Sequence, residues 1–80
     1  MNKKSLTTDE MFIVKLKQIA ESLGDVFHEV DRYQVGRAIK QNDRSVDNIV
    51  RMLAQANFIN KGEGNAIYLT RNGLTLIDGF

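Results

Sequence analysis

The chain has 80 residues, of which 42% are hydrophobic and 26% are charged, and it contains neither proline nor cysteine. This composition excludes a disordered or fibrous chain and indicates one small folded domain, which buries only roughly 60 to 65% of the surface that its unfolded form exposes. Without cysteine the chain forms no disulfide, no thiolate metal site and no cysteine nucleophile. The longest apolar run near the N-terminus covers residues 11–14, far too few for a signal-peptide core or a membrane span, so we expect a cytoplasmic protein.

The formal net charge of +1 does not by itself indicate a polyanionic partner, because nucleic-acid-binding domains usually show a clear basic excess. The charge is unevenly distributed, however. Residues 31–65 hold six basic side chains against four acidic ones, a net charge of +2, whereas residues 1–30 hold four lysines against five acids, a net charge of −1. The positive bias therefore lies in the middle of the chain.

A first helix is predicted from Thr7 to about Leu23, after a largely polar, frayed start over residues 1–6. Thr7 and Glu10 form the capping-box pattern, and Gly24 supplies a stop. The apolar positions recur every three or four residues and form one face, consisting of Phe12, Ile13, Leu16, Ile19, Ala20 and Leu23.

Residues 26–30 alternate less clearly and fit a short strand, a turn, or the start of the next helix. Asp31 with Gln34 is a second cap pattern, which predicts a short helix through Gln41. The polar residues 42–44 then interrupt the periodicity, as a turn does.

A third helix is predicted from Ser45, whose hydroxyl can cap it, to about residue 56. Asn57 follows at a position that tolerates a positive φ. Residues 58–69 contain two short apolar segments around "NKGEGNA", which is typical of a β-hairpin. Thr70 then caps a last short helix that ends near residues 78–79. The apolar face of the third helix consists of Val46, Ile49, Val50 and Leu53.

The central segment resembles the winged helix-turn-helix family over roughly residues 31–77. The residues that carry the resemblance are Val35-Gly36, Ile39, Ser45-Val46, Val50, Leu53, Asn57-Phe58-Ile59 and the later segment "YLTRNGLTLI". Lys40 departs from the pattern, because the family more often has glycine there. The resemblance implies one domain over residues 1–80 that is mainly α with a small β-hairpin: a three-helix core, a wing and a short C-terminal helix. In such a fold a small residue such as Gly36 lets two helices approach closely.

The resemblance further implies that the third helix (about 45–56) enters the major groove of double-stranded DNA and that the wing (about 58–69) lies on its backbone. The base-reading candidates are Arg44, Ser45, Asp47, Asn48 and Arg51, and the backbone-contacting candidates are Arg37, Lys40, Lys61 and Asn65. The competing interpretation is an ordinary solvated helix face on which Asp47 pairs with Arg51 at i, i+4.

We therefore expect sequence-specific DNA binding by a small transcriptional regulator. The alternative is a winged-helix module for protein–protein interaction that does not bind DNA. No nucleophile, base and orienting group surround the single histidine, His28, so no enzymatic activity is expected. His28 with Glu29 and Asp31 is a poor metal set, and residues 62–64 lack the features of a phosphate-binding loop. No cofactor, small-molecule ligand or membrane partner is indicated.

A homodimer is a further possibility, because the family usually binds pseudo-palindromic sites as dimers. Apolar residues near both ends of the chain could form the interface, and they are Phe12, Leu16, Ile19, Leu76, Ile77 and Phe80. Complete burial of the same residues inside the monomer explains the pattern equally well.

Overall fold

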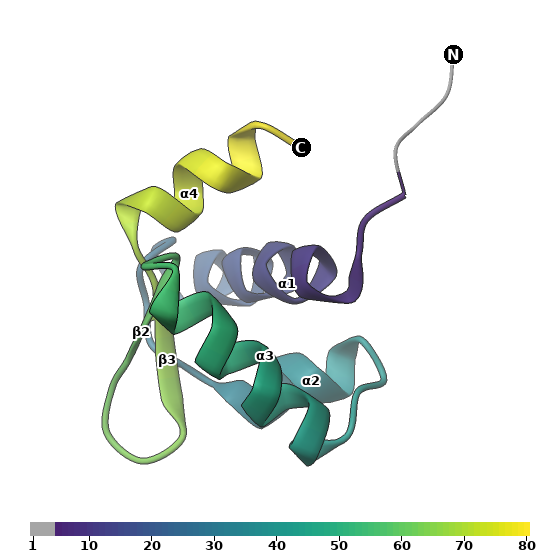
Figure 1. The fold of residues 1–80 in the computed structure, drawn as a ribbon. Helices are drawn as coiled ribbons and strands as arrows, with labels where there is room; N and C mark the ends of the chain where they lie inside the picture. Colours follow the sequence, from purple (N-terminus) through teal and green to yellow (C-terminus); the bar gives the residue numbers. More distant parts are fainter. Residues whose placement is uncertain (1–4) are drawn as a thin grey trace.

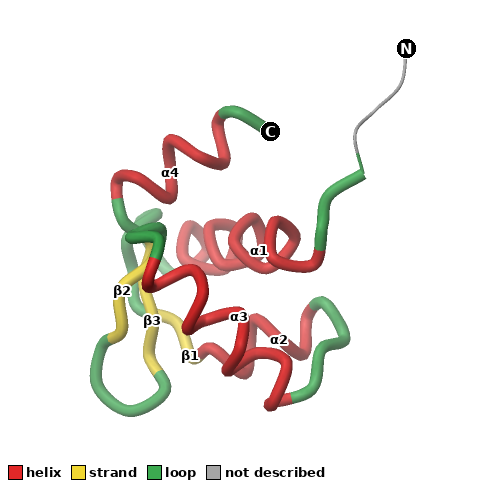
Figure 2. The backbone as a smooth tube through the Cα atoms, viewed as in Figure 1, coloured by secondary structure: helices red, strands yellow, loops and turns green. Residues whose placement is uncertain are grey.

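The computed structural model describes residues 5–80, which form four helices and a three-stranded antiparallel sheet (Figures 1 and 2). The elements are α1 (Thr8–Ser22), β1 (Val30–Asp31), α2 (Arg32–Ala38), α3 (Asp43–Gln55), β2 (Ile59–Lys61), β3 (Ala66–Leu69) and α4 (Arg71–Asp78). A mainly helical chain with a small β element is thus confirmed. Of the six residues expected to form a frayed start, 1–4 lie outside the described part of the chain.

Helix α1 lies between two layers. In Figure 1, α4 lies above it at one edge of the molecule, and α2 and α3 lie below it at the opposite edge. The loop that joins β2 to β3 also reaches this lower edge, to the left of α3 in the view. The fold therefore groups α2, α3 and the β2–β3 hairpin at the edge opposite α4.

The sheet is larger than the predicted hairpin, because a third strand pairs with it. Strand β3 is central, with β2 on one side and β1 on the other. In the register of this sheet, Val30 lies opposite Ile67, and Ile59 lies opposite Leu69. The alternatives for residues 26–30 are thereby resolved: a turn over 23–27 leads into a two-residue strand whose Val30 side chain is buried.

The core is formed by one face of α1, one face of α3 and the inner face of the sheet. Its fully buried large side chains are Phe12, Ile13, Leu16, Ile59, Ile67, Leu69, Val35, Val46 and Val50. Each such side chain stabilises the fold by about 1.5–3 kcal/mol relative to exposure. The predicted apolar faces of the first and third helices are confirmed except at Leu23, which is 50% exposed because it lies past the last turn of α1.

Three predicted helix caps are confirmed. Thr7 accepts a hydrogen bond from the backbone N–H of Glu10, whose carboxylate accepts one from the N–H of Thr7 in return. Asp31 caps α2 and Thr70 caps α4 in the same way, each with a side-chain oxygen that accepts a backbone N–H. These bonds satisfy donors that have no partner within the helix.

The predicted cap of the third helix is wrong. Asn42, not Ser45, is the N-cap of α3, and its Oδ1 atom accepts the backbone N–H of Ser45 at 2.8 Å. Asn is as good a cap as Ser, and Asp43 in the first turn favours the positive end of the helix dipole. The helix therefore begins at Asp43, and the residues that were predicted to form a turn partly belong to it.

The turn between α2 and α3 lies earlier than predicted. Helix α2 ends at Ala38 rather than at Gln41. Lys40 adopts a φ of 60°, a left-handed conformation that favours glycine, which is the residue that the winged helix-turn-helix family more often has at this position. Gly36 lies so close to α3 that an added Cβ atom would overlap the Cγ2 atom of Val46. The predicted need for a small residue at the helix crossing is confirmed.

Candidate nucleic-acid interface

The outer face of α3 is a polar stripe. Arg44, Asn48, Arg51 and Gln55 are all exposed and are spaced four, three and four residues apart. At about 3.6 residues per turn, this spacing places them in one row on the side opposite the buried residues of the helix. The row, here called the α3 stripe, contains three of the five base-reading candidates. It adds Gln55, which the sequence prediction omitted although the same spacing identifies it.

Within the α3 stripe, two side chains hold each other. The Nη2 atom of Arg51 donates a hydrogen bond of 2.6 Å to the Oδ1 atom of Asn48. The i, i+4 pair of Arg51 with Asp47, which the competing interpretation of a solvated face supposed, is not formed, because Asp47 bonds Tyr33 and lies beside Arg32 of α2. The bond orients the Arg51 guanidinium and leaves its other donors for a further acceptor.

Asp47 lies beside the α3 stripe and faces α2. Its Oδ1 atom accepts a 2.8 Å hydrogen bond from the Tyr33 hydroxyl and lies 3.7 Å from Nη1 of Arg32. The hydrogen bond to Asp47 raises the pKa of Tyr33, with desolvation and the charge of Asp47 as further causes. One oxygen of Asp47 is therefore engaged within the protein, which makes this residue a weaker base-reading candidate than its exposure suggests.

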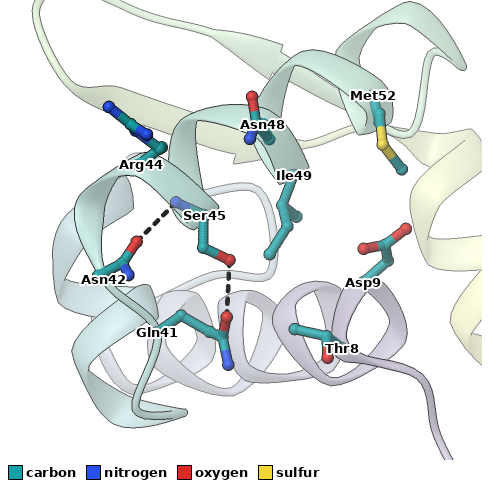
Figure 3. Close-up of a pocket in the computed structure, with 9 residues that line it drawn as sticks. All are labelled: Thr8, Asp9, Gln41, Asn42, Arg44, Ser45, Asn48, Ile49 and Met52. Atoms are coloured by element: carbon teal, nitrogen blue, oxygen red, sulfur yellow. Dashed lines mark hydrogen bonds between the residues drawn. The ribbon is translucent and has the colours of Figure 1, made fainter.

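Ser45 lies on the other flank of α3, and it faces α1. Its hydroxyl donates a 2.6 Å hydrogen bond to the Oε1 atom of Gln41, and the residue is half-buried. In Figure 3 the Ser45 and Ile49 side chains point towards α1, whereas those of Arg44 and Asn48 point away from it, although both residues also line the pocket beside them. Ser45 therefore does not belong to the outward-facing set into which it was predicted to fall.

A pocket of about 430 Å³ lies on this second flank, between α3, the turn before it and the start of α1 (Figure 3). Its residues are Thr8, Asp9, Gln41, Asn42, Arg44, Ser45, Asn48, Ile49 and Met52. Three of its polar residues are hydrogen-bonded to one another: the Ser45 hydroxyl donates to the Gln41 side chain, and the Asn42 side chain accepts the backbone N–H of Ser45. Met52, which is 51% exposed, and Ile49 add apolar surface to this lining.

The four backbone-contacting candidates are all exposed and lie on α2, the turn before α3 and the β2–β3 hairpin. Arg37 is in the last turn of α2, and Lys40 follows it in the turn before α3. Lys61 is the last residue of β2, and Asn65 directly precedes β3. The elements that carry these residues are those that Figure 1 shows together at the lower edge.

Arg32, which no sequence motif indicated, joins three of these elements. It is the first residue of α2, its backbone N–H and its Nε atom both donate to the carbonyl oxygen of Asn65, and its Nη1 atom faces Asp47. The side chain is only 13% exposed. The hairpin loop and α3 are thus held through one residue.

The other predicted features lie elsewhere. His28 is exposed, and its Nδ1 atom lies 2.7 Å from the backbone oxygen of Glu29. Within residues 5–80, no three acidic, histidine or cysteine side chains gather in a way that could hold a metal ion. None of the helices in this part of the chain is long and apolar enough to cross a membrane.

The predicted dimer interface is wrong at two of its residues. Phe12 and Leu16 are fully buried in the core and offer no surface to a second chain. The remaining four residues retain accessible area, since Ile19, Leu76 and Ile77 are half-buried and Phe80 is 41% exposed.

Comparison with models of known protein families finds no match to this chain, and comparison with curated protein sequences finds none either.

Proposed function

We propose that this chain is a cytoplasmic winged helix-turn-helix domain that binds double-stranded DNA sequence-specifically as a small transcriptional regulator. In this proposal α3 lies in the major groove, and the β2–β3 hairpin is the wing on the DNA backbone. The order of elements supports it, and so does the close crossing of α2 and α3 at Gly36. Because fold does not determine function, the argument depends on the exposed residues.

The α3 stripe is the observation that carries the proposal. It presents two arginines, an asparagine and a glutamine in one row without an acidic residue between them. An α-helix fits the major groove, where arginine binds guanine and asparagine or glutamine binds adenine through paired hydrogen bonds. A solvated helix face needs no such selection of side chains.

The surroundings of the stripe suit a polyanion better than the net charge indicates. Arg37, Lys40 and Lys61 are exposed around it and can contact phosphates. Of the two acids on α3, Asp43 is exposed in the first turn, and Asp47 is engaged by Tyr33 and Arg32. The repulsion that the Asp47 carboxylate exerts on a phosphate is thereby reduced.

The test is a fluorescence-anisotropy titration of genomic DNA fragments at low and high salt. Arg44→Ala and Arg51→Ala should each weaken binding to the preferred fragment by about fivefold or more, because a good base contact contributes about 1–3 kcal/mol. Arg71→Ala is the charge-matched control, since it removes the same charge from the first residue of α4, outside the α3 stripe. The proposal fails if the wild type binds no fragment at low salt, or if the control variant weakens binding as much as the other two.

A protein–protein interaction module is the second candidate function, and the exposed Met52 beside the pocket favours it. An apolar contact of this kind depends little on salt, whereas DNA binding weakens steeply as salt rises. If the domain binds a partner protein, Met52→Ser should abolish that binding. If the domain binds DNA, Met52→Ser should leave the DNA affinity unchanged.

We propose in addition that the DNA-binding form is a homodimer, with an interface formed by Ile19, Leu76, Ile77 and Phe80. These residues keep accessible apolar surface on α1 and at the C-terminal end, away from α3. A two-fold pair of chains could present two copies of α3 to two half-sites.

A further inference from the structure

The β2–β3 hairpin has few contacts that fix its loop relative to α3. On the side of β3 away from β2, the sheet continues only with β1, which is two residues long. The pairs Val30–Ile67 and Asp31–Ala66 end this ladder, and the next backbone bond runs from the N–H of Arg32 to the carbonyl of Asn65. Arg32 therefore makes the last backbone hydrogen bond on this side of β3 before the hairpin loop.

The side chain of Arg32 extends this contact to α3. Its Nε atom donates to the Asn65 carbonyl at 3.3 Å, and its Nη1 atom lies 3.7 Å from Oδ1 of Asp47. A guanidinium is planar and rigid, so the two acceptors are held at a separation set by one group. Asp47 is fixed in turn by the Tyr33 hydroxyl.

Two simpler roles of Arg32 fit less well. A direct phosphate contact requires outward-facing donors, but this side chain is 13% exposed and its bonded atoms face Asn65 and Asp47. A purely stabilising ion pair is also a poor explanation, because Asp47 is 52% exposed and such pairs contribute little. What the arrangement does achieve is a fixed spacing between the hairpin loop and α3.

We propose that Arg32 is a positioning residue that sets the distance between the hairpin loop and the α3 stripe, so that Lys61 and the stripe contact the same DNA molecule. The inference rests on the proposed DNA binding. Arg32 acts through the hairpin and touches no nucleotide. Its loss leaves both contact surfaces intact and removes the coupling between them.

The test is a double-mutant cycle that combines Arg32→Met with Lys61→Ala, measured by anisotropy on the preferred DNA fragment. In the wild-type background, Lys61→Ala should weaken binding severalfold and lower the slope of log affinity against log salt by about 0.9, the effect of one phosphate contact. In the Arg32→Met background, Lys61→Ala should change neither quantity. Arg44→Ala should keep its full effect in both backgrounds.

Arg32→Lys separates charge from geometry. Lysine keeps the positive charge, but its compact ammonium group lacks the separate Nε and Nη1 donors, held in one rigid plane, that reach Asn65 and Asp47. It should behave like Arg32→Met in the cycle. An equal effect of Lys61→Ala in all three backgrounds would overturn the proposed positioning role, and so would full rescue of the coupling by lysine.

A second measurement needs no DNA and therefore separates this inference from the proposed function. Amide hydrogen exchange should accelerate at Gly62 and Ala66, whose N–H groups bond within the hairpin, when Arg32 is replaced by Met. Exchange at Leu16 and Ala20 in the buried face of α1 should not change, which shows that the fold is retained. If exchange at Gly62 and Ala66 equals that of the wild type, Arg32 does not hold the hairpin, whether or not the protein binds DNA.

Discussion

The Tyr33 hydroxyl lies 2.8 Å from the Oδ1 atom of Asp47, and this hydrogen bond connects the first turn of α2 to the flank of α3. It gives the acid on the candidate DNA-facing helix a partner inside the protein. Asp47 thereby differs from Asn48 and Arg51 of the α3 stripe, which bond each other. The bond between Tyr33 and Asp47 has separate consequences for the effect of the Asp47 charge on DNA affinity and for the pH dependence of stability.

Replacing Asp47 by Asn should raise DNA affinity at low salt by roughly two- to fivefold, the size of an exposed charge interaction. Asn keeps an acceptor for Tyr33 and removes the negative charge beside the stripe. The gain should shrink as salt rises, because salt screens exposed charges. Asp78→Asn on α4 removes an equal charge at the far edge and should have no effect. A loss of affinity in Asp47→Asn that persists in the Arg32→Met background, where the contact of Asp47 with Arg32 is already absent, would instead identify Asp47 as a base-reading residue.

The bond between Tyr33 and Asp47 should stabilise the fold up to high pH and be lost beyond it. The pKa of Tyr33 in the folded state is raised above its ordinary value of 10.0, so the folded protein keeps the phenol proton more tightly than the unfolded chain. The contribution to stability is complete below pH 10.0 and disappears as pH rises through the folded pKa. Urea unfolding of the wild type and Tyr33→Phe should show a difference at neutral pH that vanishes in strong alkali.

A spectroscopic control assigns this titration to one residue. Tyr33 and Tyr68 are the two tyrosines of the chain, so Tyr68→Phe leaves only Tyr33 to report tyrosinate absorbance. Its midpoint should fall when Asp47 is replaced by Ala, since the hydrogen bond to Asp47 is the main cause of the raised pKa of Tyr33 and the charge of Asp47 also raises it. An unchanged midpoint would show that the Tyr33–Asp47 bond does not persist in solution.

Gly36→Ala should destabilise the fold by about 1–3 kcal/mol, the range expected for overpacking. The new methyl group would overlap the Cγ2 atom of Val46 and push α3 away from α2. Gly79→Ala is the matched control, because its added Cβ meets nothing closer than 3.4 Å and its φ is an ordinary −88°. Urea unfolding measures both variants, and Val46→Ala should reduce the penalty of Gly36→Ala in the double variant. Equal stabilities of the two glycine variants would contradict the close crossing.

Phe80→Ser should shift a dimer towards the monomer in sedimentation experiments if the C-terminal end forms the proposed interface. Phe80 is 41% exposed, so its replacement removes interface area without opening the core. Phe27→Ser serves as the control, because Phe27 is similarly exposed at 39% but lies in the turn after α1. A wild type that sediments as a monomer at every concentration would exclude the homodimer.

Local patterns predicted most of the elements, because helix caps and apolar periodicity depend on residues close in sequence. Thr7, Asp31 and Thr70 cap the helices that their patterns indicated. The cap of α3 was missed because Asn42 and Ser45 are equivalent as residue types, and only the backbone conformation selects between them. Where two residues of capping type lie within one turn of each other, the sequence therefore determines the first residue of the helix poorly.

The arrangement around the α3 stripe was harder to predict, since it depends on contacts between distant parts of the chain. The helical spacing allowed Arg51 to pair with Asp47, yet Arg51 bonds Asn48, and Tyr33 of α2 bonds Asp47. Arg32 reaches Asn65, which is 33 residues away, and no local motif marks such a contact. Ser45 was predicted to lie on the outer face because its hydrogen bond to Gln41 depends on the conformation of the turn, which the sequence does not show. Gln55 could have been included by extending the helical spacing by one more step.

The shape of the small sheet also bears on how the protein behaves at high concentration. Both strands at its margins are short, with two residues in β1 and three in β2, and the longer β3 lies between them. Exposed edges of long, flat strands recruit further strands from other molecules, which leads to aggregation. Margins this short offer few free backbone groups for such pairing, and Lys61 adds a charge at the end of one of them. The sheet is thus large enough to support the hairpin and too small to act as a template for fibrils.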